Sequence, residues 1–321
     1  MDQSALADRR QLRRKLGFWR IATILALVLA AGAVFFFTQG SGRSKPSAAL
    51  PHVARVEISG LIQDDRELVE RLDEIARSDS AKALVVSISS PGGTTYGGEV
   101  IYKALRKVAA VKPVVSDVRT LAASAGYMIA LGGDTIVAGE TSITGSIGVI
   151  FQYPQVKPLL DKIGVSLEEI KSSPLKAEPS PFHPATEESK AVIRDMINDS
   201  YGWFVDLVAE RRKLSRDEVL KVSDGRIYTG RQALNARLVD TLGDMDDIRT
   251  YLETRKIDKS LPLVEWKEPE TYSLFGMSSA MPWLLKMLGL AGVTPGGQLE
   301  NMGADKLFLD GLVSVWQVGA R

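Results

Sequence analysis

The chain has 321 residues, 25% of them charged, and a formal net charge of +1. This balance argues against a nucleic-acid partner, because binding phosphates needs clustered Lys and Arg. The absence of cysteine excludes disulfides, thiolate metal sites and a cysteine nucleophile. The sequence has two histidines, His52 and His183, which argues against a histidine-rich metal centre, so we expect neither a metal nor another cofactor.

The N-terminal part departs from the pattern of a soluble protein. A basic stretch at 1–20 precedes an apolar run from Ile21 to Phe37. As a helix this run would span about 26 Å, close to the ~30 Å of a hydrocarbon core. The positive-inside rule then predicts a cytoplasmic N-terminus at 1–20, a single transmembrane anchor at 21–38 in contact with membrane lipid, and the remaining chain on the other side.

A cleaved signal peptide is the alternative for this segment, since it also combines a basic start with an apolar centre. The run is longer than the usual signal-peptide core, and Phe35, Phe36 and Phe37 follow its small residues where a polar mature start is expected. A buried soluble helix is disfavoured because the run has no polar face.

Residues 39–51 are rich in Gly, Ser and Pro and predict a flexible linker. Beyond them, short β-branched runs alternate with helical patterns, which predicts an α/β domain with largely parallel strands over 52–268. The predicted strands are 53–58, 83–88, 114–118, 135–138, 147–151, 238–240 and 263–266. The predicted helices are 96–109, 124–131 and 186–213, the last capped by Thr186 and carrying an apolar stripe of Val192, Met196, Val205 and Val208.

The pattern weakens after residue 268, and 269–321 form a C-terminal extension without an assigned role. The short apolar segment at 281–290 favours a core helix or an oligomer contact over a membrane-surface segment.

Ser124 is the candidate nucleophile. It follows a strand-and-turn pattern and begins an apolar helical run, so its Oγ would lie at the positive end of a helix. A plain helix cap is the alternative role for such a serine. A nucleophilic serine needs a base to remove its proton, and with so few histidines a lysine is the leading candidate.

Lys176, in a loop-like stretch before the long predicted helix, is the candidate general base. A lysine must be neutral to accept a proton, and burial in an apolar pocket lowers its pKa while a hydroxyl orients the amine. Ser146 is a plausible orienting residue, and Lys171 is the nearest competitor for the base. A solvated surface charge is the alternative for either lysine.

Two backbone amides are candidates for an oxyanion hole, those of Gly93 and Ala125. Gly93 ends a Pro-Gly-Gly sequence after an apolar strand, and glycine lets a backbone amide approach a ligand closely. An ordinary tight turn is the alternative. A phosphate-binding loop is disfavoured, because neither glycine-rich phosphate motif follows a strand.

Five motifs in this order resemble the signal peptide peptidase A family, in its short single-repeat form, of bacterial membrane-anchored Ser-Lys proteases. The resemblance covers roughly 53–247 together with the anchor. The motifs are Ser90-Pro91-Gly92-Gly93, Ala123-Ser124-Ala125-Gly126-Tyr127, Thr144-Gly145-Ser146-Ile147-Gly148-Val149, the Lys176 loop and Asp224-Gly225-Arg226-Ile227-Tyr228-Thr229-Gly230.

The resemblance implies a ClpP/crotonase-like fold of repeated ββα units. It implies Ser124 as nucleophile, Lys176 as base, Ser146 orienting the lysine, and the amides of Gly93 and Ala125 as the oxyanion hole. It also implies signal peptides as substrates, sites shared between adjacent protomers of a ring-like homo-oligomer, and a catalytic domain on the periplasmic side of a bacterial inner membrane.

Two residues depart from the usual family motifs. Ala125 stands where the serine motif commonly has Gly, but an alanine amide can still donate. Ser173 stands where the lysine loop commonly has Gly, which could alter the path of that loop.

Three other functions remain as alternatives. A Ser-His-Asp protease would need a histidine shortly after Ser124, and His183 is the first one after it. A crotonase-type acyl-CoA enzyme would need an acidic base, and the anchor argues against it. A non-enzymatic membrane scaffold would keep the fold and the oligomer without a working dyad.

Overall fold

The computed structural model describes residues 19, 22–27, 50–267 and 313–315. The chain divides into two compact units, Met1–Leu50 and Pro51–Arg321. In the first unit, residues 22–27 are helical. Across the described ranges, no helix is both long and apolar enough to cross a membrane, and most of the predicted anchor at 21–38 lies outside them.

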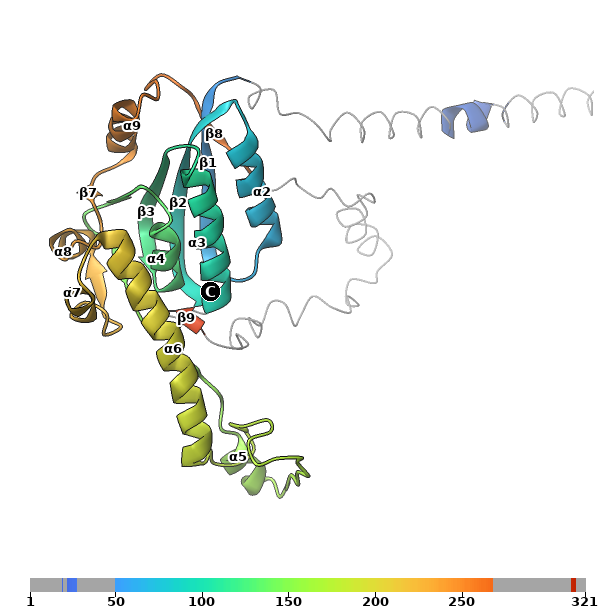
Figure 1. The fold of residues 1–321 in the computed structure, drawn as a ribbon. Coiled ribbons are helices and arrows are strands. Elements are labelled where there is room, and N and C mark those ends of the chain that lie inside the picture. The colour runs from blue at the N-terminus through green and yellow to red at the C-terminus, as the bar shows by residue number, and fades with distance from the viewer. Residues whose placement is uncertain (1–18, 20–21, 28–49, 268–312, 316–321) are drawn as a thin grey trace, which may run out of the picture. The chain divides into compact units, whose positions relative to one another are not determined.

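The second unit is built on one sheet whose strands run in the order β6-β5-β3-β2-β1-β8 (Figure 1). The pairs β1–β2, β2–β3, β3–β4 and β3–β5 are all parallel, as the alternation of strands and helices predicts. The strands are β1 (His52–Ile62), β2 (Ala81–Thr94), β3 (Val114–Ala123), β4 (Thr135–Ala138), β5 (Ile143–Gly145), β6 (Ile227–Thr229), β7 (Thr241–Leu242), β8 (Leu263–Glu265) and β9 (Val313–Val315).

Side chains alternate between the two faces of the central strands, and each face has its own apolar core. On β2, Leu84, Val86 and Ile88 belong to the larger core, whereas Ala83 and Val85 belong to the smaller one. The helices that pack on the larger core are α2 (Arg66–Arg77), α3 (Thr95–Ala109), α4 (Ala125–Ala130), α6 (Glu187–Arg212), α7 (Arg216–Leu220) and α8 (Gly230–Asn235).

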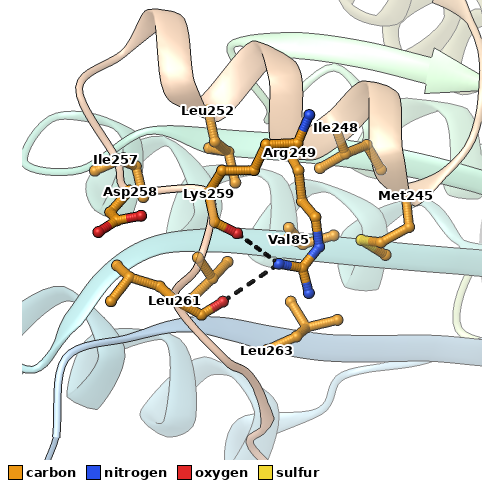
Figure 2. Close-up of a pocket in the computed structure, with 11 residues that line it drawn as sticks. Val85, Met245, Ile248, Arg249, Leu252, Ile257, Asp258, Lys259, Leu261 and Leu263 are labelled. Atoms are coloured by element: carbon orange, nitrogen blue, oxygen red, sulfur yellow. Dashed lines mark hydrogen bonds between the residues drawn. The ribbon is translucent and has the colours of Figure 1, made fainter.

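The smaller core is covered by α9 (Met245–Thr254), which buries Ile248 and Leu252. Figure 2 shows the hollow between α9 and the sheet, where Arg249 Nη1 donates to the carbonyl oxygens of Lys259 and Leu261 at 2.8 and 3.4 Å. The hollow holds about 10 Å³ and is lined mainly by apolar side chains, so it has room for no more than one water. It is a packing gap and too small for a peptide.

A separate feature extends from the first half of α6. Figure 1 shows α5 (Lys157–Lys162) near the end of α6 that is remote from the sheet. Within the described part of the chain, α5 contributes no buried side chain. We call α5, the loop at 163–186 and the first part of α6, up to residue 196, the arm.

Most predicted elements are confirmed, including β4 and the helix capped by Thr186. The apolar stripe of α6 is buried only in its second half. Val205 and Val208 are buried, but Val192 and Met196 are 43% and 46% exposed because this half of α6 extends beyond the sheet.

The strand predicted at 147–151 is wrong. The strand of this region is β5, at 143–145, and it ends where Gly145 and Ser146 both take positive φ angles. In this segment Ile150 makes one isolated bridge, to Val313.

The strand predicted at 238–240 is also misplaced, because β7 occupies 241–242. Arg237 has a φ of 60°, and the Leu238 amide donates to the carbonyl oxygen of Ala233 at 2.8 Å. These are the marks of a Schellman cap, so Leu238 is the apolar residue that closes α8.

Candidate active site

Ser124 occupies a sharp turn between β3 and α4. Its φ and ψ are 59° and −119°, in a region that favours glycine, and only 1% of the residue is exposed. Its amide donates to the carbonyl oxygen of Gly145 at 2.8 Å, while its own carbonyl accepts from Met128. In the described part of the chain, the side chain of Thr94 caps the start of α3, whereas the side chain of Ser124 does not cap the start of α4. Backbone strain at a strand-to-helix turn is typical of a nucleophile elbow.

The two candidate oxyanion amides lie at the start of helices. Ala125 is the first residue of α4, where amides lack an acceptor within the helix. Gly93 stands two residues before α3. A Cβ atom at Gly93 would lie 1.9 Å from the carbonyl oxygen of Ile62, so only glycine fits this position.

Ser90 supports the Pro-Gly-Gly turn, a role that the sequence analysis did not assign. Its Oγ donates to the carbonyl oxygen of Gly60 at 2.6 Å and accepts from the amide of Gly92 at 3.1 Å. A serine directly before Pro-Gly-Gly is the available sequence signal, since serine hydroxyls bond to nearby backbone in turns.

The strand register brings these segments to one edge of the sheet. Ser90 on β2 pairs with Ala122 on β3, and both strands are parallel. A Cβ atom at Gly126 would lie 2.9 Å from the carbonyl oxygen of Ser90, so α4 approaches β2 at close range. Gly93, near the end of β2, and Ser124 and Ala125, directly after β3, therefore lie at the carboxyl ends of neighbouring parallel strands, where α/β sheets bind ligands.

Ser146 lies beside this edge through β5. Gly145 pairs with Ala123, directly before Ser124, and Ser146 is 7% exposed with a φ of 51°. The amide of Ser146 donates to the carbonyl oxygen of Arg226 at 2.7 Å. The motif at 224–230 thus holds the turn that carries Ser146 through β6, which pairs with β5.

Lys176 is exposed and lies in the loop of the arm. Figure 1 shows this loop beside the end of α6 that is remote from the sheet, and the other four residues lie at the sheet. The segment 155–183 is folded on itself, with Gln155 Nε2 donating to the carbonyl oxygens of Ser180 and His183 at 3.0 and 3.2 Å. The structure therefore brings together Ser124, Ser146, Gly93 and Ala125, and it places Lys176 elsewhere.

Lys171, the competing base, is held in an ionic cluster. Its Nζ lies 2.5 Å from Glu169 Oε2 and 2.6 Å from Glu178 Oε1. Hydrogen bonds to Glu169 and then to Glu178 raise the pKa of Lys171 above its ordinary value. A raised pKa keeps the ammonium protonated, so Lys171 is unsuited to accept a proton from a serine.

The same cluster is the one candidate for metal binding among the residues that the structure describes. Ligand atoms of Glu169, Glu178 and His183 all lie within 4.8 Å of one another. The ammonium of Lys171 already contacts both carboxylates, and it supplies the positive charge that a cation would bring. The cluster is best described as a set of ion pairs.

Neither histidine is placed to serve Ser124. His52 begins β1, at the sheet edge opposite to the one that Ser124 follows, and its Nε2 accepts from Trp266 Nε1 at 3.0 Å. His183 belongs to the cluster around Lys171, with its Nε2 3.1 Å from Glu178 Oε1. This arrangement disfavours a Ser-His-Asp triad within one chain.

Comparisons with known proteins agree with this architecture. The profile of peptidase family S49 matches residues 106–257, and that of Clp protease matches residues 46–141. A Synechocystis protein named as a candidate protease is 36% identical over 245 residues, which cover 74% of this chain and 88% of that protein.

Two further relatives cover similar parts of the chain. A Methanocaldococcus jannaschii protein named as a candidate protease is 37% identical over 216 residues, covering 67% of this chain and 70% of that protein. An Enterococcus faecium protein named as a candidate signal peptide peptidase is 32% identical over 233 residues, covering 68% of each. The chain therefore belongs to peptidase family S49, the signal peptide peptidase A family, and is a serine protease with a ClpP-like fold.

Proposed function

We propose that this protein is a membrane-anchored Ser-Lys endopeptidase that degrades cleaved signal peptides and other membrane-associated peptides. The observation that carries the proposal is the strained, buried turn at Ser124, with the amide of Ala125 directly after it. Such a turn presents a serine to a substrate carbonyl, and a helix start supplies donors for the oxyanion that forms.

In this mechanism Ser124 Oγ attacks the peptide carbonyl while neutral Lys176 accepts its proton. The amides of Gly93 and Ala125 donate to the oxyanion, and Ser146 orients the lysine amine. Lys176 then returns the proton to the leaving amine, and water hydrolyses the acyl-enzyme with Lys176 acting again as base. Each oxyanion donor contributes roughly 3 kcal/mol to such a reaction.

The lysine is supplied by a neighbouring protomer of a homo-oligomer. Two observations support this sharing: Lys176 lies on the arm, away from Ser124, and the arm exposes many large apolar side chains. An exposed apolar surface of this kind marks a protein interface. Among these side chains are Leu159, Ile163, Val165, Leu167, Ile170 and Phe182.

Peptide substrates bind as an added strand beside the oxyanion glycine. β9 supports this mode, since it pairs antiparallel with 92–94 of β2, with Ser314 opposite Gly93. Val313 also exchanges two backbone hydrogen bonds with Ile150. The edge of β2 thus accepts an extended chain, and strand addition is a recurring way to bind peptides through main-chain hydrogen bonds.

The apolar run from Ile21 to Phe37 supports an anchor in the bacterial inner membrane. The basic residues before it favour a cytoplasmic N-terminus, which leaves the protease domain on the periplasmic side. Signal peptides remaining in the membrane would reach the active site from that side.

The test uses the full chain in detergent micelles with a synthetic signal peptide. We expect hydrolysis by the wild type and none above background by Ser124→Ala or Lys176→Ala, while both variants keep the wild-type oligomer. Reassembling the two variants at equal amounts should restore about a quarter of wild-type activity, because one interface in four then combines an intact serine with an intact lysine.

Three other outcomes would contradict parts or all of the proposal. Activity retained by Lys176→Ala would refute the lysine base. No recovery after demonstrated subunit exchange would refute shared sites. If the folded, oligomeric wild type failed to cleave any peptide, the scaffold or acyl-CoA alternative would take its place.

A further inference from the structure

The loop that carries Lys176 is closed by a partly buried ionic cluster, which we call the Lys171 cluster: Glu169, Lys171, Glu178 and His183. Lys171 stands five residues before Lys176, and Glu178 stands two residues after it. Their side chains meet at 2.6 Å, so this ion pair joins the two ends of the loop. The Glu178 side chain is only 6% exposed, which shields this contact from solvent.

Further contacts fix the cluster within the arm. His183 Nε2 lies 3.1 Å from Glu178 Oε1 and 3.5 Å from Glu169 Oε2. The buried Ser180 donates through its amide to Glu178 Oε2 at 3.3 Å and through its Oγ to Glu169 Oε1 at 3.4 Å. Both carboxylates therefore have several partners, and together they tie residues 169–183 into one unit.

The backbone inside the closed loop is also ordered. The amide of Lys176 donates to the carbonyl oxygen of Ser173 at 3.1 Å, and that of Glu178 donates to Leu175 at 3.3 Å. Ala177, directly after Lys176, has a φ of 61°. The direction in which the Lys176 side chain leaves the loop thus depends on an unusual backbone conformation, which the ends of the loop must hold in place.

We propose that the Lys171 cluster positions Lys176 for catalysis, with Lys171 and Glu178 as positioning residues that close its loop. This inference rests on the proposed role of Lys176 as general base. Lys176 is exposed in a single chain, and in the proposed function it meets the serine of another protomer, so contacts within its own chain must hold its loop until the two protomers meet. Closing the loop in advance lowers the conformational entropy that is lost when the base meets the serine.

The test measures kcat and KM of the full-length enzyme with the signal peptide for Lys171→Met and Glu178→Gln. We expect kcat to fall about 10- to 100-fold for Lys171→Met, as small misplacements of a catalytic group do, with KM within about twofold of wild type. Glu178→Gln keeps the size of the side chain and should lower kcat in the same direction. Lys171→Arg keeps the charge and should restore most of kcat.

The matched control is Lys103→Met. It removes a lysine whose ion pair with Glu99, at 2.5 Å, lies on α3 and outside the arm, and its kcat should equal that of wild type. Lys171→Met or Glu178→Gln retaining at least half of wild-type kcat would overturn the proposal. So would a tenfold loss of kcat in Lys103→Met, or a loss in Lys171→Met that Lys171→Arg does not restore.

Lys176→Ala separates this proposal from the function on which it rests. An inactive Lys176→Ala beside a fully active Lys171→Met would contradict the positioning role and would still support the Ser-Lys dyad. An active Lys176→Ala would remove the dyad, whatever the cluster variants do.

Discussion

At Ser124 the surrounding structure holds a backbone conformation that is unfavourable in itself. Its backbone conformation is one that L-residues other than glycine rarely adopt, and a residue held there costs about 1–3 kcal/mol. The surrounding structure holds it through the Gly145 carbonyl and through the close approach of α4 to β2. We infer that the fold retains this strain because it presents Oγ at the carboxyl edge of the sheet.

Replacing Ser124 by glycine tests this strain directly. Ser124→Gly and Ser124→Ala both remove the hydroxyl and should both be inactive. Ser124→Gly should nevertheless be more stable than Ser124→Ala, by about 1 kcal/mol in urea unfolding, because glycine accepts a φ of 59° without the clash of a Cβ atom. Equal stability of the two variants would show that the turn is unstrained.

Glu218 gives the protein a defined sensitivity to acid. A hydrogen bond from the amide of Ser215, then one from its hydroxyl, and a contact with Arg237 lower the pKa of Glu218 from 4.5 to about 2. A lowered folded-state pKa contributes stability above the unfolded pKa, and that stability is lost as the pH falls through the folded value. The relevant window therefore runs from about pH 4.5 down to about pH 2.

Glu218→Gln should remove this part of the acid dependence. We expect its melting temperature to lie below that of wild type at pH 6, with the difference shrinking as the pH falls toward 2. Asp217→Asn takes one charge from the same turn of α7 and leaves Ser215 and Arg237 untouched, so it controls for net charge. A difference that stays constant with pH would contradict the assignment.

At the scale of elements, the end of β2 pairs with strands on both of its sides. Gly93 pairs with Ile62 on one side and with Ser314 of β9 on the other, and α3 begins two residues later. β9 therefore occupies the edge where the proposed peptide substrate would pair. It follows that this segment and a substrate compete for the same backbone groups.

Val313→Pro should weaken that competition. Proline removes the amide that donates to Ile150 at 3.1 Å, and the loss of one such bond weakens the pairing of β9 by about 1 kcal/mol. We expect KM for the signal peptide to fall up to about fivefold with kcat unchanged, measured by initial rates. Val313→Ala keeps the amide and is the control. An unchanged or higher KM for Val313→Pro would show that β9 and the substrate do not compete.

At the scale of the molecule, the arm carries most of the large apolar side chains that are exposed among the described residues of the second unit. Its apolar side chains are exposed at positions along α5, the following loop and the start of α6. Val192 and Met196 continue the stripe that Val205 and Val208 bury against the sheet. A second copy of the chain is the occupant that would both cover this surface and complete the active site.

Polar substitutions on the arm should therefore dissociate the oligomer. Ile163 and Leu167 are 63% and 53% exposed in one chain, and losing their burial at an interface would cost roughly 3 kcal/mol in Ile163→Ser/Leu167→Ser. We expect a shift toward monomers by analytical ultracentrifugation, and a parallel loss of activity although Ser124 and Lys176 are unchanged. Val111→Ser, at an apolar residue 66% exposed beyond α3, should alter neither. An intact oligomer in the double variant would contradict the proposed interface.

The parts of the fold that the sequence predicts well are those with a local signal. The β-branched runs of β1 to β3 and the cap at Thr186 depend on neighbouring residues, and both are confirmed. The strands expected at 147–151 and 238–240 failed because backbone turns at Ser146 and Arg237 redirected the chain. Serine and arginine do not favour positive φ angles, so the residue types at these two positions give no sign of the turns.

The candidate site also has a part that the sequence predicts and a part that depends on tertiary contacts. Short motifs were enough to predict five candidate site residues, Ser124, Gly93, Ala125, Ser146 and Lys176. Each motif contains the hydroxyl, the amine or the backbone amide that the proposed chemistry needs. Sequence alone also determined the family resemblance and the candidate anchor, which depend on order and composition. What only the tertiary structure decided is which groups meet, since contacts between distant residues depend on how strands pair and loops close. It gave Ser124 its strained turn, bound Lys171 to two carboxylates, and put Lys176 on an arm away from the serine of its own chain.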